Sequence, residues 1–336
     1  MYEKFYGLSA KPFQLSPDPH FFFASKGHKR AASYLEYGLS QEEGFIVITG
    51  EIGAGKTTLL RNLFNKLQSK NIVAAQIVNT NLDAVDTLRM VAGAFGLPFD
   101  GDTKANLLNR IEQFLCACSR QRKRALLVVD EAQNLTPHAV EELRMLSNFQ
   151  TADKSLLQIF LLGQPEFRKT LLGEDMKQLQ QRVIATYHLG PMDALETRSY
   201  IEHRLHTVGW RDSPSFSDEA FAAIYDFTGG IPRKINTLCD RLLLMGYLEE
   251  IRAFGKSEVD EVTRDIQQEF VLPAAEAKAK TLSKASQAEL VVNSHINQQN
   301  VDERLSKMER SVTSVLSLLK QILSLSSIKN LPKDKS

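Results

Sequence analysis

An eight-residue stretch of the chain has the residue types and the spacing of a loop that binds phosphate groups. It reads Gly50-Glu51-Ile52-Gly53-Ala54-Gly55-Lys56-Thr57 and stands between an apolar run and an amphipathic one. Glycines at this spacing let the backbone wrap an anion and present its N–H groups at the start of a helix, where the helix dipole favours negative charge. Lys56 would reach the β- and γ-phosphates of a nucleotide, and the Thr57 hydroxyl would bind Mg²⁺. We therefore expect ATP and Mg²⁺ as ligands, with the nucleotide held by Gly50, Glu51, Ile52, Gly53, Ala54, Gly55, Lys56, Thr57 and Thr58.

Two adjacent carboxylates follow a second apolar run. Residues 126–129 read Leu-Leu-Val-Val, and Asp130 and Glu131 come next. Successive side chains at the end of a strand point in different directions, so one carboxylate can serve a metal ion while the other serves the nucleophile. We expect Asp130 to hold Mg²⁺, usually through water, and Glu131 to polarise the water that attacks the γ-phosphate. Taken alone, the two carboxylates could simply form an acidic turn after a strand. The presence of the phosphate-binding loop in the same chain favours the catalytic interpretation.

A further polar residue ends a later apolar run. Gln164 follows the stretch 156–162, and ligand sites in open α/β sheets form beyond the carboxyl ends of the strands. An amide at this point can contact the γ-phosphate and orient water, which makes Gln164 a candidate catalytic residue. The alternative is a turn residue before Pro165.

The elements that must position these residues follow from the pattern of the first 190 residues. Short β-branched runs alternate with long amphipathic stretches, and the runs are 45–49, 72–78, 125–129, 156–162 and 183–189. This alternation predicts a parallel α/β sheet sandwiched by helices. From residue 191 to residue 270 the pattern is helical only, so we expect a small all-helical domain after the α/β domain.

In this order the motifs resemble those of AAA+ ATPases, which are P-loop NTPases with an appended helical lid. More narrowly, the sequence is similar to the general secretion pathway protein A (ExeA-type) ATPases, and most of all to the subfamily found with PEP-CTERM/exosortase loci in bacteria that make extracellular polysaccharide. The resemblance covers residues 1–270. It rests on FYGLSAKPFQLSPDPHFFFAS, GHKRA, GEIGAGKTTLLR, VVDEAQNL, LRMLSNF, LLGQPEF, QRVIATYHLGPM and GGIPRKINTLCDRLLL.

The resemblance implies roles for two arginines. Arg233, in GGIPR, matches the sensor-2 arginine that contacts the γ-phosphate from the lid of the same subunit. Arg182, in QQRV, matches the position from which related ATPases supply an arginine finger to a neighbouring subunit. A planar guanidinium stabilises the negative charge that spreads over a transferring phosphoryl group. The alternatives are that Arg233 only begins a helix and that Arg182 is an ordinary surface residue.

The resemblance also implies an enzyme that hydrolyses ATP to ADP and phosphate, that forms a homo-oligomer and that drives or regulates envelope export or polysaccharide assembly with protein partners. Together with the pattern, it divides the chain into parts. They are an N-terminal segment packing on the ATPase (1–42), the ATPase core (43–190), a helical lid (191–270), a linker (271–300) and a short coiled-coil or amphipathic helix (301–326).

The last part of the chain has no aromatic residues, since all 18 Phe, all 8 Tyr and the single Trp precede Val271. Its apolar residues alternate in steps of four and three, which is the spacing of a heptad seam. They are Val301, Leu305, Met308, Val312, Val315, Leu319 and Ile322. We expect self-association or partner docking through this helix. A peripheral membrane contact and an unbound helix are the alternatives.

Composition and charge narrow the function classes. The chain is 43% hydrophobic and 24% charged with a net charge of +1, and residues 1–270 carry more acidic than basic side chains, so nucleic acid is an unexpected partner. The basic run Arg120 to Arg124 is interpreted as the cationic end of a helix. The three cysteines suit a reducing compartment, and no export signal or apolar span occurs. We expect a cytoplasmic protein, with the inner membrane face as an alternative location.

Two other functions stay open on sequence grounds. A DNA-associated regulator resembling transposition ATPases would share this core, and a salt titration of DNA affinity would reveal it. A nucleotide-dependent scaffold with negligible turnover would share the same loop, and a phosphate-release assay would reveal that case.

Overall fold

A computed structural model describes residues 1–16, 18–67, 71–78, 83–151 and 154–270 of the chain. The expected linker at 271–300 and the expected helix at 301–326 lie outside the described residues. None of the helices in the described ranges combines the length and the hydrophobicity that a membrane crossing requires.

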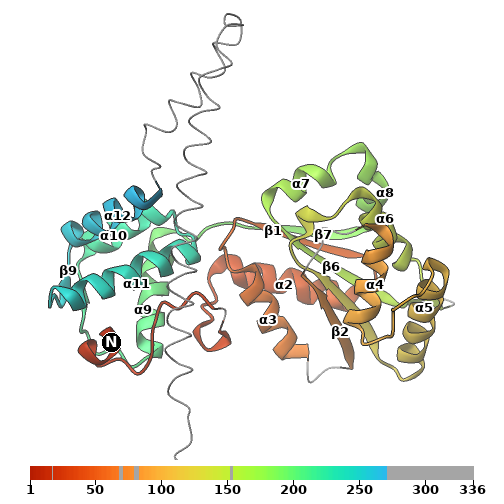
Figure 1. The fold of residues 1–336 in the computed structure, drawn as a ribbon, viewed down its shortest axis with the longest axis horizontal. Helices are drawn as coiled ribbons and strands as arrows, with labels where there is room; N and C mark the ends of the chain where they lie inside the picture. The colour runs from red at the N-terminus through yellow and green to blue at the C-terminus, as the bar shows by residue number, and fades with distance from the viewer. Residues whose placement is uncertain (17, 68–70, 79–82, 152–153, 271–336) are drawn as a thin grey trace, which may run out of the picture. The chain divides into compact units, whose positions relative to one another are not determined.

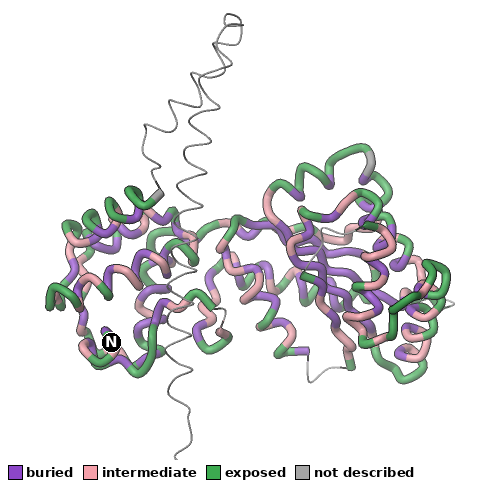
Figure 2. The backbone as a smooth tube through the Cα atoms, in the orientation of Figure 1, coloured by how far each residue is buried: buried purple, intermediate pink, exposed green. Residues whose placement is uncertain are grey.

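A parallel sheet lies among the helices of the part of the chain up to residue 190 (Figure 1). It has five strands in the order β2-β3-β6-β1-β7. The strands are β1 (Phe45–Gly50), β2 (Ile72–Ile77), β3 (Arg124–Val129), β6 (Leu157–Gly163) and β7 (Val183–Leu189). Each end lies within one residue of the run expected from the sequence, so the parallel α/β sheet is confirmed. The inner strands β1, β3 and β6 are buried almost throughout (Figure 2), which is why they read as continuous apolar runs.

Helices cover both faces of this sheet, and β3 shows how the faces are divided. Leu126 and Val128 pack with α2 (Lys26–Gln41) and α3 (Lys56–Leu67), whereas Leu127 and Val129 pack with helices of the opposite face. Successive side chains of a strand alternate between faces, so one strand contributes to two cores. The helices of the opposite face are α4 (Ala84–Ala94), α5 (Lys104–Arg120), α6 (Pro137–Leu146), α7 (Pro165–Leu171) and α8 (Lys177–Gln180).

The helices expected between residues 191 and 270 are present, and we call this part of the chain the lid. It contains one small feature that the helical pattern did not predict. Its helices are α9 (Ala194–Thr207), α10 (Asp218–Thr228), α11 (Pro232–Leu248) and α12 (Lys256–Phe270). Two strands of two residues each, β8 (Ser215–Phe216) and β9 (Ala253–Phe254), pair in parallel just before α10 and α12. Runs this short have no periodicity to detect. A second pair of two-residue strands, β4 (Gln150–Thr151) and β5 (Lys154–Ser155), is antiparallel and precedes β6.

The N-terminal segment is divided between two hydrophobic cores. Its first part, which includes α1 (Tyr2–Tyr6), Phe13 and Phe21, is buried in the core of the lid. The Arg204 guanidinium on α9 donates from Nε to the Pro12 carbonyl at 2.7 Å, which ties this part to the lid. Helix α2 instead packs on the sheet. The segment therefore contributes side chains both to the core of the lid and to the core beside the sheet.

Candidate functional site

The candidate residues meet at one edge of the sheet because the strands are parallel and in register. Thr49 of β1 pairs with Gly163 of β6, and Val129 of β3 pairs with Leu161 of β6. The phosphate-binding loop after β1, the acidic pair after β3 and Gln164 after β6 therefore emerge side by side. This is the carboxyl edge, where open α/β sheets bind ligands.

The loop from Gly50 to Lys56 needs glycine at two positions where other chain segments approach it. Gly53 has φ +83°, and a Cβ there would stand 2.4 Å from the Cβ of Arg233. Gly55 has φ +95°, and a Cβ there would stand 2.6 Å from Nε2 of His28. Both φ values lie in the left-handed region that L side chains rarely adopt. The loop is thus closely packed between the start of lid helix α11 and the N-terminal segment.

Lys56 lies inside the loop rather than on its surface. Its Nζ donates to the Gly50 carbonyl at 2.6 Å and to the Glu51 carbonyl at 3.0 Å. Burial lowers the pKa of this ammonium, while the nearby carboxylates of Glu131 and Asp130 oppose that shift. The ammonium is therefore held at the place where the loop presents its N–H groups.

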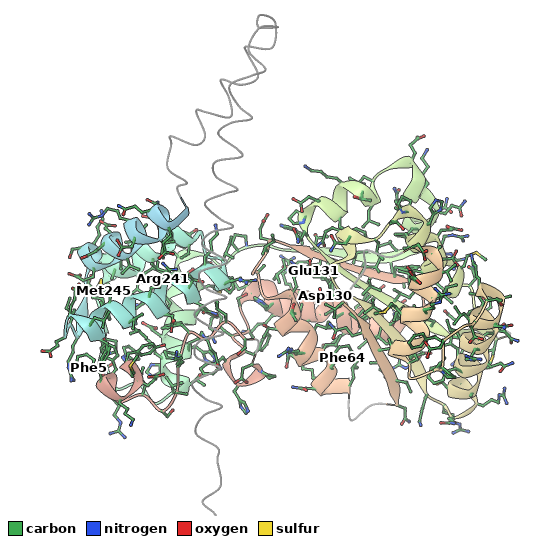
Figure 3. All side chains as sticks on the ribbon, viewed as in Figure 1. Phe5, Phe64, Asp130, Glu131, Arg241 and Met245 are labelled. Atoms are coloured by element: carbon green, nitrogen blue, oxygen red, sulfur yellow. The ribbon has the colours of Figure 1, made fainter. Side chains whose placement is uncertain are left out.

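The acidic pair has one buried member, and that member faces the loop. Asp130 is 3% exposed, its Oδ2 accepts from the Thr57 hydroxyl at 3.4 Å, and its Oδ1 accepts from the Glu131 backbone N–H at 3.0 Å. Burial raises the pKa of the Asp130 carboxyl. The hydrogen bond from the Glu131 backbone N–H opposes this rise, as do Lys56 and Thr57, whereas the charge of the Glu131 side chain adds to it. Figure 3 shows Asp130 and Glu131 next to each other at the end of the sheet.

The donor set of Thr57 and Asp130 fits Mg²⁺. Both groups are hard oxygen donors, and a carboxylate that burial destabilises is relieved by a cation beside it. Mg²⁺ typically takes only one or two carboxylates from the protein and completes its shell with water and substrate phosphates.

Glu131 is held by two amide side chains. It has φ +54°, an uncommon conformation for a residue other than glycine. Its Oε2 accepts from Nε2 of Gln133 at 2.6 Å and from Nε2 of Gln164 at 3.3 Å. Oε1 of Gln133 in turn accepts from the backbone N–H of Gln164 at 3.0 Å. Gln133 was not predicted as a site residue, although its place two positions after Glu131 was a usable signal.

The two arginines lie at opposite ends of the sheet. The backbone N–H of Arg233 donates to the Gly53 carbonyl at 3.2 Å, so this arginine stands directly at the loop. Arg182 precedes β7, whose Val183 pairs with Phe45 at the amino end of β1. Six strand residues, roughly 20 Å, therefore separate Arg182 from the loop after Gly50. Its guanidinium donates instead to the Ser147 hydroxyl at 3.3 Å, outside the site of its own chain.

A cavity of about 310 Å³ extends from the loop toward the lid and the N-terminal segment. Most of the candidate residues line it, namely Ile52, Gly53, Gly55, Lys56, Thr57, Thr58, Glu131, Gln164 and Arg233. Gly50, Glu51 and Ala54 belong to the loop backbone behind it. The remaining lining residues come from the N-terminal segment and the lid, and we call them the far part of the cavity. They are Gln14, Leu15, Ser16, Asp18, Phe21, Phe22, Phe23, His28, Met192, Tyr200, Arg204, Pro232 and Asn236.

His28 connects this far part to the loop. Its Nδ1 lies 2.8 Å from the Ser25 hydroxyl, and its ring is hydrogen-bonded to the Ala54 backbone. Burial lowers the pKa of the imidazole. A neutral ring that donates from Nε2 to the Ala54 carbonyl leaves Nδ1 to accept from Ser25, which satisfies both ring nitrogens.

Comparisons with known proteins agree with this geometry. Residues 39–171 match the family model described as "AAA domain". Over 248 residues, or 74% of the chain, the sequence is 40% identical to "General secretion pathway protein A" of Aeromonas hydrophila, and the chain spans 45% of that relative's length. Residues 39–171 are therefore an AAA domain, and its sheet is that of a P-loop NTPase.

Solved structures share the fold at low sequence identity. The ORC2 protein of Aeropyrum pernix has a TM-score of 0.57 at 15% identity, over 76% of this chain and 71% of that one. Cdc6p of Pyrobaculum aerophilum has a TM-score of 0.59 at 16% identity, over 76% of this chain and 70% of that one. At these identities the likeness concerns the fold alone.

Proposed function

We propose that the chain is an ATP-hydrolysing AAA+ ATPase of the general secretion pathway protein A (ExeA) type. The observation that carries the proposal is a single cavity lined by the phosphate-binding loop, Glu131, Gln164 and Arg233. Binding of a triphosphate needs the loop alone. The carboxylate, the amide and the guanidinium at the same cavity are what hydrolysis requires in addition.

The mechanism follows from which groups can donate and which can accept. The loop N–H groups and Lys56 would bind the β- and γ-phosphates, and Arg233 would stabilise charge on the γ-phosphate. Thr57 and Asp130 would hold Mg²⁺, which neutralises charge on the phosphate oxygens when bound. Glu131 would accept a proton from water while the water oxygen forms the new bond to phosphorus and the bond to the ADP oxygen breaks. Gln164 would orient that water.

Arg182 would act on a neighbouring copy of the chain. Its place at the amino end of β7 excludes it from the cavity of its own chain. A guanidinium there is available only to a second subunit that brings its loop against this edge. We therefore propose a homo-oligomer with composite sites, in which each site takes one guanidinium from its neighbour.

The process we propose is export or assembly at the bacterial envelope, from the cytoplasmic side. The support is the 40% identity to a protein named for general secretion. A PEP-CTERM or exopolysaccharide system is the narrower form of the proposal, and it rests on the motifs of the N-terminal segment and the loop. The fold likeness to ORC2 and Cdc6p does not favour DNA as a partner, and the excess of acidic side chains in residues 1–270 opposes it.

Phosphate release and nucleotide binding by two variants test this proposal. Lys56→Ala should lose tight MgATP binding, because the buried ammonium would no longer neutralise the phosphates. Glu131→Gln should keep MgATP binding and lose turnover, because an amide cannot accept the proton. Wild-type turnover in Glu131→Gln would remove the proposed base, and a wild-type chain that retains no nucleotide with Mg²⁺ would end the proposal.

A further inference from the structure

Three polar side chains form a hydrogen-bond chain at the far end of the cavity. Arg204 is 5% exposed, and its Nη1 donates to the Tyr200 hydroxyl at 2.7 Å. The Tyr200 hydroxyl lies 2.9 Å from Oδ1 of Asn236. All three residues line the cavity. The same guanidinium donates from Nε to the Pro12 carbonyl, which anchors its position.

The hydrogen bonds among these three side chains have a consistent direction in the structure. A guanidinium has donors and no acceptor, so the Tyr200 oxygen accepts from Arg204. The hydroxyl proton of Tyr200 is in turn donated to Oδ1 of Asn236. This hydrogen bond orients the Asn236 amide with its oxygen toward Tyr200. Its Nδ2, with two N–H donors, points away from Tyr200.

The Asn236 Nδ2 group is directed toward the cavity. Asn236 is 7% exposed and lines the cavity, and it lies three residues after Arg233, on the same face of α11. Within the described ranges, no acceptor is hydrogen-bonded to this Nδ2, and it is not among the buried polar atoms cut off from solvent. Since Oδ1 is hydrogen-bonded to Tyr200, Nδ2 is the polar atom of this side chain that is left to face the cavity.

The position of Asn236 indicates which part of a nucleotide it would meet. Arg233 stands at Gly53 of the phosphate-binding loop, and Asn236 lies one helical turn farther from the loop. Aromatic rings that line the cavity lie against the other two members of the hydrogen-bond chain, Phe23 against Tyr200 and Phe21 against Arg204. These suit the faces of a base and its sugar rather than a phosphate.

We propose that Asn236 is a specificity-determining residue whose amide N–H groups donate to a hydrogen-bond acceptor on the nucleoside, with Tyr200 and Arg204 fixing the amide in the donating orientation. The inference rests on the proposed binding of ATP and names the residue that reads its nucleoside. A ring nitrogen of the base and a ribose oxygen are the two sources of such an acceptor. A ligand that presents a donor at this point would be rejected, because two donors would then face each other.

The first test exchanges the donor for an acceptor without changing the shape of the side chain. Asn236→Asp keeps an oxygen for the Tyr200 proton and places a second oxygen where Nδ2 was. We expect MgATP to bind about ten- to a hundredfold more weakly, measured by equilibrium competition in the Glu131→Gln background. Asn109→Asp, the same exchange at an exposed position on α5, should leave binding unchanged. Equal affinity in Asn236→Asp and in its parent would overturn the inference.

The second test finds the acceptor and does not depend on the Asp variant folding. The ligands are ATP, 2′-deoxy-ATP, 3′-deoxy-ATP, and the 1-deaza, 3-deaza and 7-deaza forms of ATP. We expect one of these analogues to bind the parent about fivefold or more weakly than ATP, and the difference to vanish in Asn236→Ala. A deoxy analogue identifies the ribose and a deaza analogue identifies the base. If every analogue keeps its ratio to ATP after the substitution, Asn236 reads no acceptor.

These outcomes separate the inference from the proposed function. A parent protein that binds MgATP, together with an Asn236→Asp variant that binds equally well, removes the role of Asn236 and leaves the ATPase proposal intact. A parent protein without any MgATP binding removes both.

Discussion

Gln133 provides the sharpest test of how the catalytic carboxylate is positioned. Its Nε2 donates to Oε2 of Glu131 at 2.6 Å, and its Oε1 accepts from the Gln164 backbone at 3.0 Å, yet it does not line the cavity. Gln133→Met keeps the length of the side chain and removes both hydrogen bonds. A hydrogen bond to a charged group contributes about 1.5–3 kcal/mol. If that energy holds Glu131 in its reactive position, kcat should fall about ten- to a hundredfold while the Kd for MgATP stays the same.

Steady-state phosphate release and competition binding measure the two quantities on the same preparation. Gln113→Met, at an exposed position on α5, makes the same exchange outside the site and should change neither. An unchanged kcat in Gln133→Met would refute the positioning argument. A raised kcat would refute it as well, because it would mean that Gln133 holds Glu131 away from water. A joint rise in Kd would indicate damage to the loop instead.

Three further outcomes are expected. Gly53→Ala should weaken MgATP binding at least tenfold and lower the melting temperature. The new Cβ would stand 2.4 Å from the Cβ of Arg233, and the backbone φ of +83° is unfavourable for alanine. Binding at the parental affinity would contradict this expectation. Burial lowers the pKa of His28 in the folded chain. As the pH falls below the ordinary value of 6.5, the unfolded chain therefore binds a proton at this histidine before the folded chain does. The free energy of unfolding decreases over this range, until the pH has passed the pKa of the folded state. Urea unfolding at several pH values should show this loss, and His28→Asn should make it shallower; an identical slope would exclude the histidine. Arg182→Ala and Lys56→Ala should each lack turnover alone and recover part of it when mixed, because a mixed oligomer contains intact loops beside intact arginines. No recovery in mixed oligomers would argue against action on a neighbour.

The sequence predicted the features that depend on neighbours in the chain. The loop from Gly50 to Thr57 is recognisable because the glycines that let the backbone wrap a phosphate, the lysine and the hydroxyl-bearing residue must follow one another at a set spacing. Asp130 and Glu131 are recognisable because they end an apolar run. The five strands were located to within one residue because strands buried on both faces must be apolar along their whole length. The helical pattern of the lid followed from the same kind of local periodicity.

The tertiary structure alone decided which of these pieces meet. The strand order β2-β3-β6-β1-β7 brings Gln164 to Glu131 and leaves Arg182 at the opposite edge, and no local pattern encodes that order. Gln133 belongs to the site because it contacts both Glu131 and Gln164, which the fold brings together.

The same holds for the far part of the cavity, where the N-terminal segment meets the lid. Arg204 holds the Pro12 backbone across 192 positions of sequence, and the Tyr200 hydroxyl, which accepts from Arg204, donates to the Asn236 amide oxygen. A residue type at one position predicts what chemistry is available. The direction in which a donor points depends on partners that only the folded chain assembles, because hydrogen bonds act over about 3 Å and not over sequence distance.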